Sequence, residues 1–153
     1  MAREILFKAK RVDNGEWVEG YYCKYGFVGK EKHYIIPSYA SDLYAFEIDI
    51  NTLCKYTGLT DKNGRKIWEG DLLKNSDDDL LMVVRWDEDD LRFLLDDYGY
   101  RGCLMEYGWD ETAGGFGVVE TYGFNDFYHI NEHSEVIGNI FDNPELLGGA
   151  DNG

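Results

Sequence analysis

Short strand-like segments separated by turn residues recur along the whole chain, and they restrict it to a β-rich fold. Strand candidates follow one another at intervals of about eight to twelve residues, and few stretches show helical periodicity. Twelve Tyr, eight Phe, four Trp and eighteen Gly, against two Pro, suit pleated strands joined by tight turns. A length of 153 residues allows a real core in one domain or in two small ones. We therefore predict an all-β fold.

The first 55 residues predict an N-terminal β-meander subdomain. Ile5, Phe7 and Ala9 stand at every second position, which is the period of a half-buried strand. Asn14-Gly15 supplies the positive φ angles of a tight hairpin turn. Further strands are expected over residues 17–23, 33–36 and 44–50, and the last has the clearest alternation, with Tyr44, Phe46, Ile48 and Ile50.

The rest of the chain predicts a second domain, which we interpret as an SH3-like β-barrel. Asp61-Lys62-Asn63-Gly64 forms a turn, because Asn-Gly tolerates left-handed backbone and Asp caps its own loop. Asp142 or Asn143 can cap a short helical turn with Pro144 at its first position. That turn belongs to a final segment, 142–153, and we expect the segment to end in a disordered tail. Within the barrel domain, 56–141, strands are expected over residues 67–68, 72–73, 80–86, 91–95, 118–122, 127–130 and 135–140.

Several motifs of the chain also resemble a known family. The central ones are Tyr56-Thr57-Gly58-Leu59, Asp61-Lys62-Asn63-Gly64 and Ile67-Trp68-Glu69-Gly70-Asp71. The opening residues 3–9 and the closing stretch with Gly138, Asn139 and Pro144 fit the same pattern. Together they resemble the YopX family of phage and prophage proteins. The resemblance implies this two-part fold, a viral genomic context and structural roles for the motif residues, but no particular activity.

The charge of the chain is strongly asymmetric. Its net charge is −15, with 12 basic and 11 acidic groups in residues 1–74 but 3 basic and 19 acidic groups in residues 75–153. The acidic part would repel a phosphate backbone, so we predict that it does not bind duplex nucleic acid directly. Contact through the first part stays open, and an ordinary solubilising acidic surface is the simplest interpretation. The cations of the first part include Lys8, Lys10, Arg11, Lys24, Lys30 and Lys32.

Nothing in the sequence indicates a membrane or an oxidising compartment. Apolar runs of about eighteen residues or more are absent, and the opening residues lack the apolar core of a signal peptide. Cys23, Cys54 and Cys103 are odd in number and contain no Cys-x-x-Cys pair. We therefore expect a cytoplasmic protein of the host cell, with no membrane association and with reduced, mostly buried thiols.

No motif predicts a catalytic, cofactor or metal site. The acidic runs 77–79 and 87–90 stand at the two ends of one predicted strand, about 23 Å apart. A two-metal site needs ions roughly 4 Å apart, so each run could bind at most one divalent ion weakly, and a solvated loop is simpler. His129 and His133 lack a third ligand in sequence, which favours surface histidines. For Asp71, a buried carboxylate that accepts backbone N–H groups is favoured over a general acid or base.

Three functions are compatible with these features. The first is a non-enzymatic β module that self-associates, as a homo-oligomer, or binds an unknown phage or host protein. The second is an acidic DNA mimic that occupies a host nucleic-acid-binding protein, and the third is a metal-assisted hydrolase. We expect the first, with no cofactor. The candidate interaction surface consists of Asp87, Glu88, Asp89, Asp90, Tyr98 and Tyr100.

Overall fold

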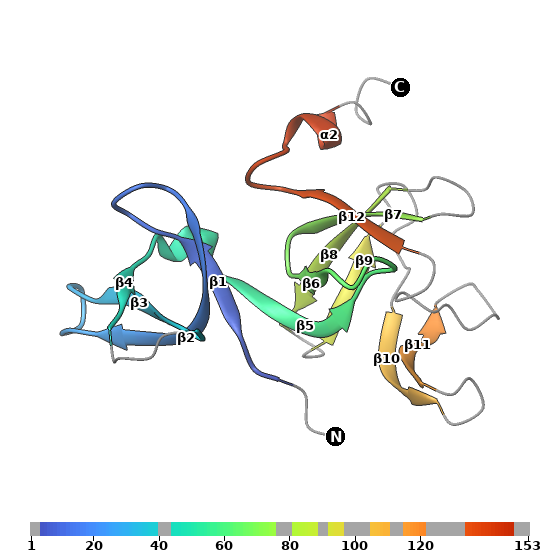
Figure 1. Cartoon of the computed structure of the whole chain (residues 1–153), viewed down its shortest axis with the longest axis horizontal. Coiled ribbons are helices and arrows are strands. Elements are labelled where there is room, and N and C mark those ends of the chain that lie inside the picture. The colour runs from blue at the N-terminus through green and yellow to red at the C-terminus, as the bar shows by residue number, and fades with distance from the viewer. Residues whose placement is uncertain are drawn as a thin grey trace. The chain divides into compact units, whose positions relative to one another are not determined.

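The computed structural model describes residues 4–39, 44–75, 81–88, 92–96, 105–110, 115–121 and 134–148. Antiparallel strands make up most of these residues, and the α-helix described among them is a single turn, α2 (Glu145–Gly148) (Figure 1). The all-β prediction is therefore confirmed. The chain divides into two compact units, Met1–Tyr56 and Thr57–Gly153. The sequence places its predicted boundary after residue 55.

The first unit is an antiparallel sheet in which the first four strands pair in sequence order and the fifth pairs with the first. Its core consists of Ala9, Val18, Ile35 and Ile48, and partly buried aromatic and aliphatic side chains pack against this core. A short 3-10 turn, η1 (Ile50–Thr52), precedes the last strand. The strands, in the order β4-β3-β2-β1-β5, are β1 (Phe7–Lys10), β2 (Trp17–Tyr25), β3 (Lys32–Pro37), β4 (Phe46–Glu47) and the first residues of β5 (Cys54–Thr60).

The segment that contains β4 is hydrogen-bonded on both sides. β4 pairs with β3, and the N–H of Ile48 donates to the carbonyl oxygen of His33 at 2.9 Å. On the opposite side, Arg11 forms a bridge with Ile48, and the N–H of Val12 donates to the carbonyl oxygen of Glu47 at 3.0 Å. The sheet therefore curls until the end of β1 meets the fourth strand, which leaves less open edge than a flat meander would.

Two of the predicted strand patterns are wrong in detail. Ile5 is exposed and Leu6 is buried, because β1 begins only after them and the period of two does not extend back to Ile5. The alternation over residues 44–50 yields only the two strand residues of β4. Asp49 ends the extended backbone, because its side chain accepts the N–H of Asn51 at 3.0 Å and starts η1.

The second unit contains a four-stranded antiparallel sheet in the order β12-β7-β8-β9. These strands are β7 (Asp71–Asn75), β8 (Leu81–Asp87), β9 (Arg92–Asp96) and β12 (Ser134–Asn139). β5 continues into this unit and neighbours β6 (Lys66–Trp68), while β10 (Met105–Asp110) and β11 (Gly115–Thr121) form a separate pair. The core is built from Leu59, Ile67, Leu73, Met82, Val84, Phe93, Leu95 and Val136, and Trp86 packs against it.

Most strands predicted for this unit are present. The predicted pairing of 80–86 with 91–95 is confirmed by β8 and β9, whereas β10 was not predicted and the strand predicted at 127–130 lies outside the described residues. Within the described part of the unit, the four-stranded sheet is open. Closure into an SH3-like barrel therefore stays a prediction. The terminal helical turn is α2, which begins directly after Pro144.

Candidate interaction face

Asp61 holds the turn between β5 and β6 and attaches it to β12. Its Oδ1 accepts the N–H groups of Asn63 and Arg65, each at 2.9 Å, and its Oδ2 accepts the N–H of Val136 at 2.9 Å. The residue is only 3% exposed, and Gly64 takes a φ of +80° in the turn. The predicted turn is confirmed. Because three backbone N–H groups donate to this carboxylate, a structural role accounts for an aspartate at this position.

Gly70 and Asp71 hold a second turn, between β6 and β7. The Oδ2 of the buried Asp71 accepts the N–H of Trp68 at 2.8 Å, as the sequence predicts for a turn carboxylate. Gly70 has a φ of +87°; its N–H donates to the carbonyl oxygen of Val84, and its own carbonyl oxygen accepts the N–H of Ile140. This turn therefore ties β8 and the end of β12 together. Glu69 beside it is half-buried.

The closing motif forms a third turn, after β12. The Oδ1 of Asn139 accepts the N–H groups of Phe141 and Asp142 at 2.9 and 2.8 Å. The Oδ1 of Asn143 in turn accepts the N–H of Asn139 at 3.2 Å. A Cβ at Gly138 would lie 2.4 Å from that Oδ1, so a glycine there leaves room for the Asn143 side chain.

Thr57, Leu59 and Ile67 are buried within the second unit. Thr57 donates its hydroxyl to the carbonyl oxygen of Ile67 at 2.7 Å and accepts the N–H of Leu59 at 3.1 Å. Leu59 and Ile67 belong to the core, Tyr56 is buried, and Gly58 has a φ of +86°. These contacts are structural and explain the spacing of the motifs.

The acidic surface predicted from the sequence lies almost entirely outside the described residues. Asp87 ends β8 and Glu88, which follows it, is exposed. Asp89, Asp90, Tyr98 and Tyr100 are outside the described ranges, as are residues 77–79, His129, His133 and Cys103. Among the residues that are described, no group of three or more His, Cys, Asp or Glu side chains could hold a metal ion. Of the two described cysteines, Cys54 is buried, as expected for mostly buried thiols, and Cys23 is exposed.

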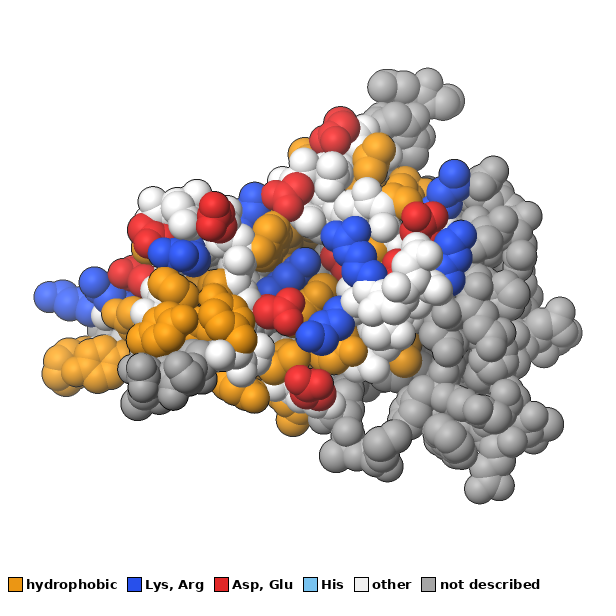
Figure 2. All heavy atoms as spheres, in the orientation of Figure 1, with side chains coloured by type: hydrophobic (Ala, Val, Ile, Leu, Met, Phe, Trp, Pro, Cys, Tyr) orange, Lys and Arg blue, Asp and Glu red, His pale blue; other side chains and the backbone are white. Residues whose placement is uncertain are grey.

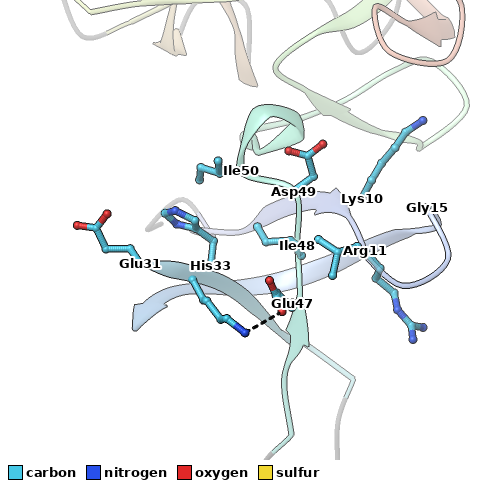
Figure 3. A pocket seen from close by; sticks show the side chains of 11 residues that line it. Lys10, Arg11, Gly15, Glu31, His33, Glu47, Ile48, Asp49 and Ile50 are labelled. Atoms are coloured by element: carbon cyan, nitrogen blue, oxygen red, sulfur yellow. Dashed lines mark ion pairs between the residues drawn. The ribbon is translucent and has the colours of Figure 1, made fainter. Parts of the chain in front are cut away.

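A cavity of about 490 Å³, lined by both polar and apolar groups, lies in the first unit, where the segment around β4 meets the end of β1. The ammonium group of Lys32 lies 3.7 Å from a carboxylate oxygen of Glu47 (Figure 3). Arg11 points away from His33 and donates to Asp13 outside the cavity at 2.6 and 2.9 Å, which holds the pKa of the Asp13 carboxyl below its ordinary value. The lining is Lys10, Arg11, Val12, Gly15, Glu31, Lys32, His33, Glu47, Ile48, Asp49 and Ile50.

His33 at the wall of this cavity is already engaged with the sheet. Its Nδ1 lies 2.7 Å from the hydroxyl of Tyr22, and the two rings stack with centroids 5.9 Å apart. Burial raises the pKa of the Tyr22 hydroxyl above its ordinary value, because the charged phenolate is less well solvated there. The imidazole is therefore coupled to a tyrosine, and the cavity lining contains no Ser, Thr or Cys that it could activate.

The opposite face of the same sheet presents aromatic side chains. Val18 and Tyr22 of β2 point to the core, so the alternate positions Trp17, Tyr21 and Tyr25 point away from it. Across the ladder, Tyr21 is paired with Ile36, Cys23 with Tyr34, and Tyr25 with Lys32. Tyr21 and Tyr25 are exposed, and Trp17, Tyr34 and Ile36 are half-buried. We call Trp17, Tyr21, Tyr25, Tyr34 and Ile36 the aromatic face.

Lysines border the aromatic face. The ammonium groups of Lys8 and Lys10 on β1 lie 4.6 and 5.4 Å from the centroid of the Trp17 ring. Such contacts are attractive, because the face of an indole ring carries partial negative charge. Figure 2 shows hydrophobic side chains gathered over the first unit, with Lys and Arg side chains beside them. Sequence analysis missed this face. The spacing of the aromatic residues at 17, 21 and 25 places them on one side of a strand, but it does not say which side the core covers.

The family comparison agrees with the motifs that the structure places at turns. The sequence model of the family described as YopX protein matches residues 6–148. The chain belongs to the YopX family. The match spans both units and includes every motif residue from Tyr56 to Pro144, so the resemblance inferred from those motifs is confirmed. None of the curated proteins compared with this YopX-family chain matches it.

The helical segments among the described residues of this YopX-family chain are short. None is long and apolar enough to cross a bilayer. The one α-helix among the described residues has four residues, against the twenty or so that a span needs.

Proposed function

We propose that this YopX-family chain is a non-enzymatic β module that works by association, first of all with further copies of itself. The aromatic face is the observation that carries the proposal. Tyr and Trp are enriched in protein interfaces, where they contribute a large share of the binding energy. Two tyrosines of this face, Tyr21 and Tyr25, are exposed and therefore accessible to a partner.

The charge split supports a contact between unlike parts of two copies. Residues 1–74 are nearly neutral, with 12 basic and 11 acidic groups, whereas residues 75–153 carry 19 acidic groups against 3 basic ones. Two acidic parts repel each other, so a contact of first part with second part has the lower electrostatic cost. A contact between unlike surfaces repeats from copy to copy, and it closes into a ring if the rotation allows.

Light scattering coupled to size exclusion tests the proposal. We expect a defined oligomer at low salt that loses subunits as the salt concentration approaches about 1 M, where the Debye length falls to about 3 Å. Aromatic burial weakens little with salt, so part of the affinity should persist at intermediate concentrations. A monomer at every salt concentration and at every accessible protein concentration would contradict self-association.

Three finer features belong to the same proposal. The family resemblance supports a phage or prophage origin and a site of action in the host cytoplasm. Closure of the second unit into an SH3-like barrel is supported by the packing of β5 and β6 residues, such as Leu59 and Ile67, in one core with the four-stranded sheet. The module also binds an unknown phage or host protein in this proposal.

A DNA mimic is the second candidate, and the excess of 16 negative charges in residues 75–153 is the observation that favours it. The chain would then occupy a host nucleic-acid-binding protein through its acidic part. Affinity for that protein should fall steeply with salt. Replacement of Asp77–Asp79 and of the carboxylates at 87–90 by their amides should abolish the capture of such a protein from nuclease-treated lysate. Unchanged capture would exclude the mimic.

A further inference from the structure

The connection between β2 and β3 is a tight, well-defined tip. The N–H of Lys30 donates to the carbonyl oxygen of Phe27 at 2.8 Å, which closes a four-residue turn. Gly29 has a φ of +83° and Gly26 a φ of +119°, conformations that residues with a Cβ rarely adopt. A Cβ at Gly26 would also lie 2.6 Å from the Lys30 carbonyl oxygen. We call Tyr25–Lys32 the hairpin tip.

The hairpin tip exposes large apolar side chains where turns usually carry polar ones. Phe27 is 85% exposed and Val28 is 96% exposed, and Tyr25 at the base of the tip is 76% exposed. Phe27 and Val28 take the first two positions of the turn, for which Asp, Asn, Ser and Pro are the favoured residues. A single exposed apolar residue is ordinary, but three at one projecting tip suit insertion into a partner.

The hairpin tip also projects beyond its neighbouring strand. β1 begins with Phe7, which pairs with Gly20, so β2 from Tyr21 to Tyr25 has β3 on one side and no described strand on the other. Figure 1 places the connection at the left end of the first unit, where Figure 2 shows hydrophobic side chains beside Lys or Arg side chains. The two-stranded end of β2 and β3 therefore holds Phe27 and Val28 away from the rest of the sheet.

The charge around the hairpin tip is opposite to that of the chain as a whole. Lys24, Lys30 and Lys32 stand here against Glu31, whereas the whole chain has a net charge of −15. Lys24 and Lys30 are exposed, and neither forms an ion pair with another described residue. A cationic rim around an apolar centre complements an acidic surface that offers apolar contacts.

We propose that the hairpin tip is the docking element of self-association and that it inserts Phe27 and Val28 against the acidic part, residues 75–153, of a second copy. The inference rests on the proposed function, because it names the surface through which the copies associate. Charge complementarity selects this occupant, since that part carries 19 acidic groups against 3 basic ones. An anionic membrane is a poorer occupant, because it would repel the acidic chain as a whole.

The test measures the self-association constant of the full chain and of two variants by sedimentation equilibrium at low salt. Phe27→Ser with Val28→Ser removes the apolar centre, and Lys24→Glu with Lys30→Glu reverses the rim. We expect either variant to weaken association by about tenfold or more. All four side chains are exposed, so circular dichroism and the unfolding midpoint should stay within a small margin of wild type.

Two matched controls separate the hairpin tip from general effects of polarity and charge. Val12→Ser changes an exposed valine elsewhere in the first unit, and Lys62→Glu with Lys66→Glu makes the same change in net charge in the second unit. These controls should associate within about threefold of wild type.

The outcomes are distinguishable. A wild-type chain that is monomeric under all conditions overturns the proposed function and this inference together. A wild-type chain that associates, with tip variants that associate equally well, overturns only the inference. Flotation with vesicles of anionic or zwitterionic phospholipid tests whether the hairpin tip binds a membrane instead of a second copy. Binding to anionic vesicles by wild type but not by the Phe27→Ser, Val28→Ser variant would assign the tip to a lipid surface instead and overturn the proposal.

Discussion

Replacement of Asp61 by Ala is expected to remove about 3–5 kcal/mol from the free energy of unfolding. Its carboxylate accepts three backbone N–H groups, from Asn63, Arg65 and Val136, and it is almost completely buried. A hydrogen bond to a charged group contributes about 1.5–3 kcal/mol, and removal of the acceptor leaves buried donors without a partner. Urea unfolding followed by tryptophan fluorescence measures the loss, because Trp68 lies buried in the same unit.

Two further variants make this result specific. Asp61→Asn keeps one acceptor oxygen but turns an NH₂ group toward a backbone N–H, so an intermediate loss is expected. Asp13→Ala removes an exposed carboxylate whose ion pair with Arg11 lies at the surface, and it should change the stability by less than about 0.5 kcal/mol. A loss below about 1 kcal/mol for Asp61→Ala would contradict the structural role assigned to the motif.

Replacement of Gly20 by Ala should destabilise the first unit by about 3 kcal/mol or more. A Cβ at this position would lie 2.0 Å from the carbonyl oxygen of Ile36 and 2.8 Å from the nitrogen of Ser38. Both are backbone atoms, which cannot rotate away as a side chain can, so the end of β3 would have to move. A thermal scan should show a midpoint lower by roughly 10 °C in a chain of this size.

The matched control is Gly15→Ala in the turn between β1 and β2. Gly15 has a φ of +73° but open space around its Cβ direction. The substitution therefore costs only the conformational strain, about 1 kcal/mol. If Gly20→Ala and Gly15→Ala had equal effects, close contact between β2 and β3 at Gly20 would not be the reason for a glycine there.

Sequence reasoning predicted the fold where local chemistry determines it. The turn at Asp61-Lys62-Asn63-Gly64 follows from residues that prefer it, and the pairing of β8 with β9 follows from two adjacent apolar runs. The alternation from Tyr44 to Ile50 wrongly predicted a long strand, because the hydrogen bond from the Asn51 N–H to the Asp49 side chain starts a 3-10 turn there. The bonding of the β4 segment to both β3 and β1 is a tertiary effect that no local pattern reports.

The candidate site was harder to predict from sequence, because it depends on which face of a strand is covered. Trp17, Tyr21 and Tyr25 share one face of β2, but alternation alone does not say whether that face or the one with Val18 and Tyr22 is buried. Phe27 and Val28 are exposed in a turn where Gly26 and Gly29 have positive φ angles, and no strand pattern includes them. The acidic run at 87–90 is conspicuous in sequence, yet residues 89 and 90 lie outside the described ranges.

Hydrogen exchange measured by mass spectrometry on dilute and on concentrated wild-type protein tests the central claim most directly. If the chain associates through its first unit, peptides that cover Tyr21–Lys32 should exchange more slowly in the concentrated sample, together with peptides from residues 75–153. The difference should disappear in high salt, where electrostatic complementarity is screened. Slower exchange elsewhere, with Tyr21–Lys32 unchanged between the dilute and the concentrated sample, would contradict the account.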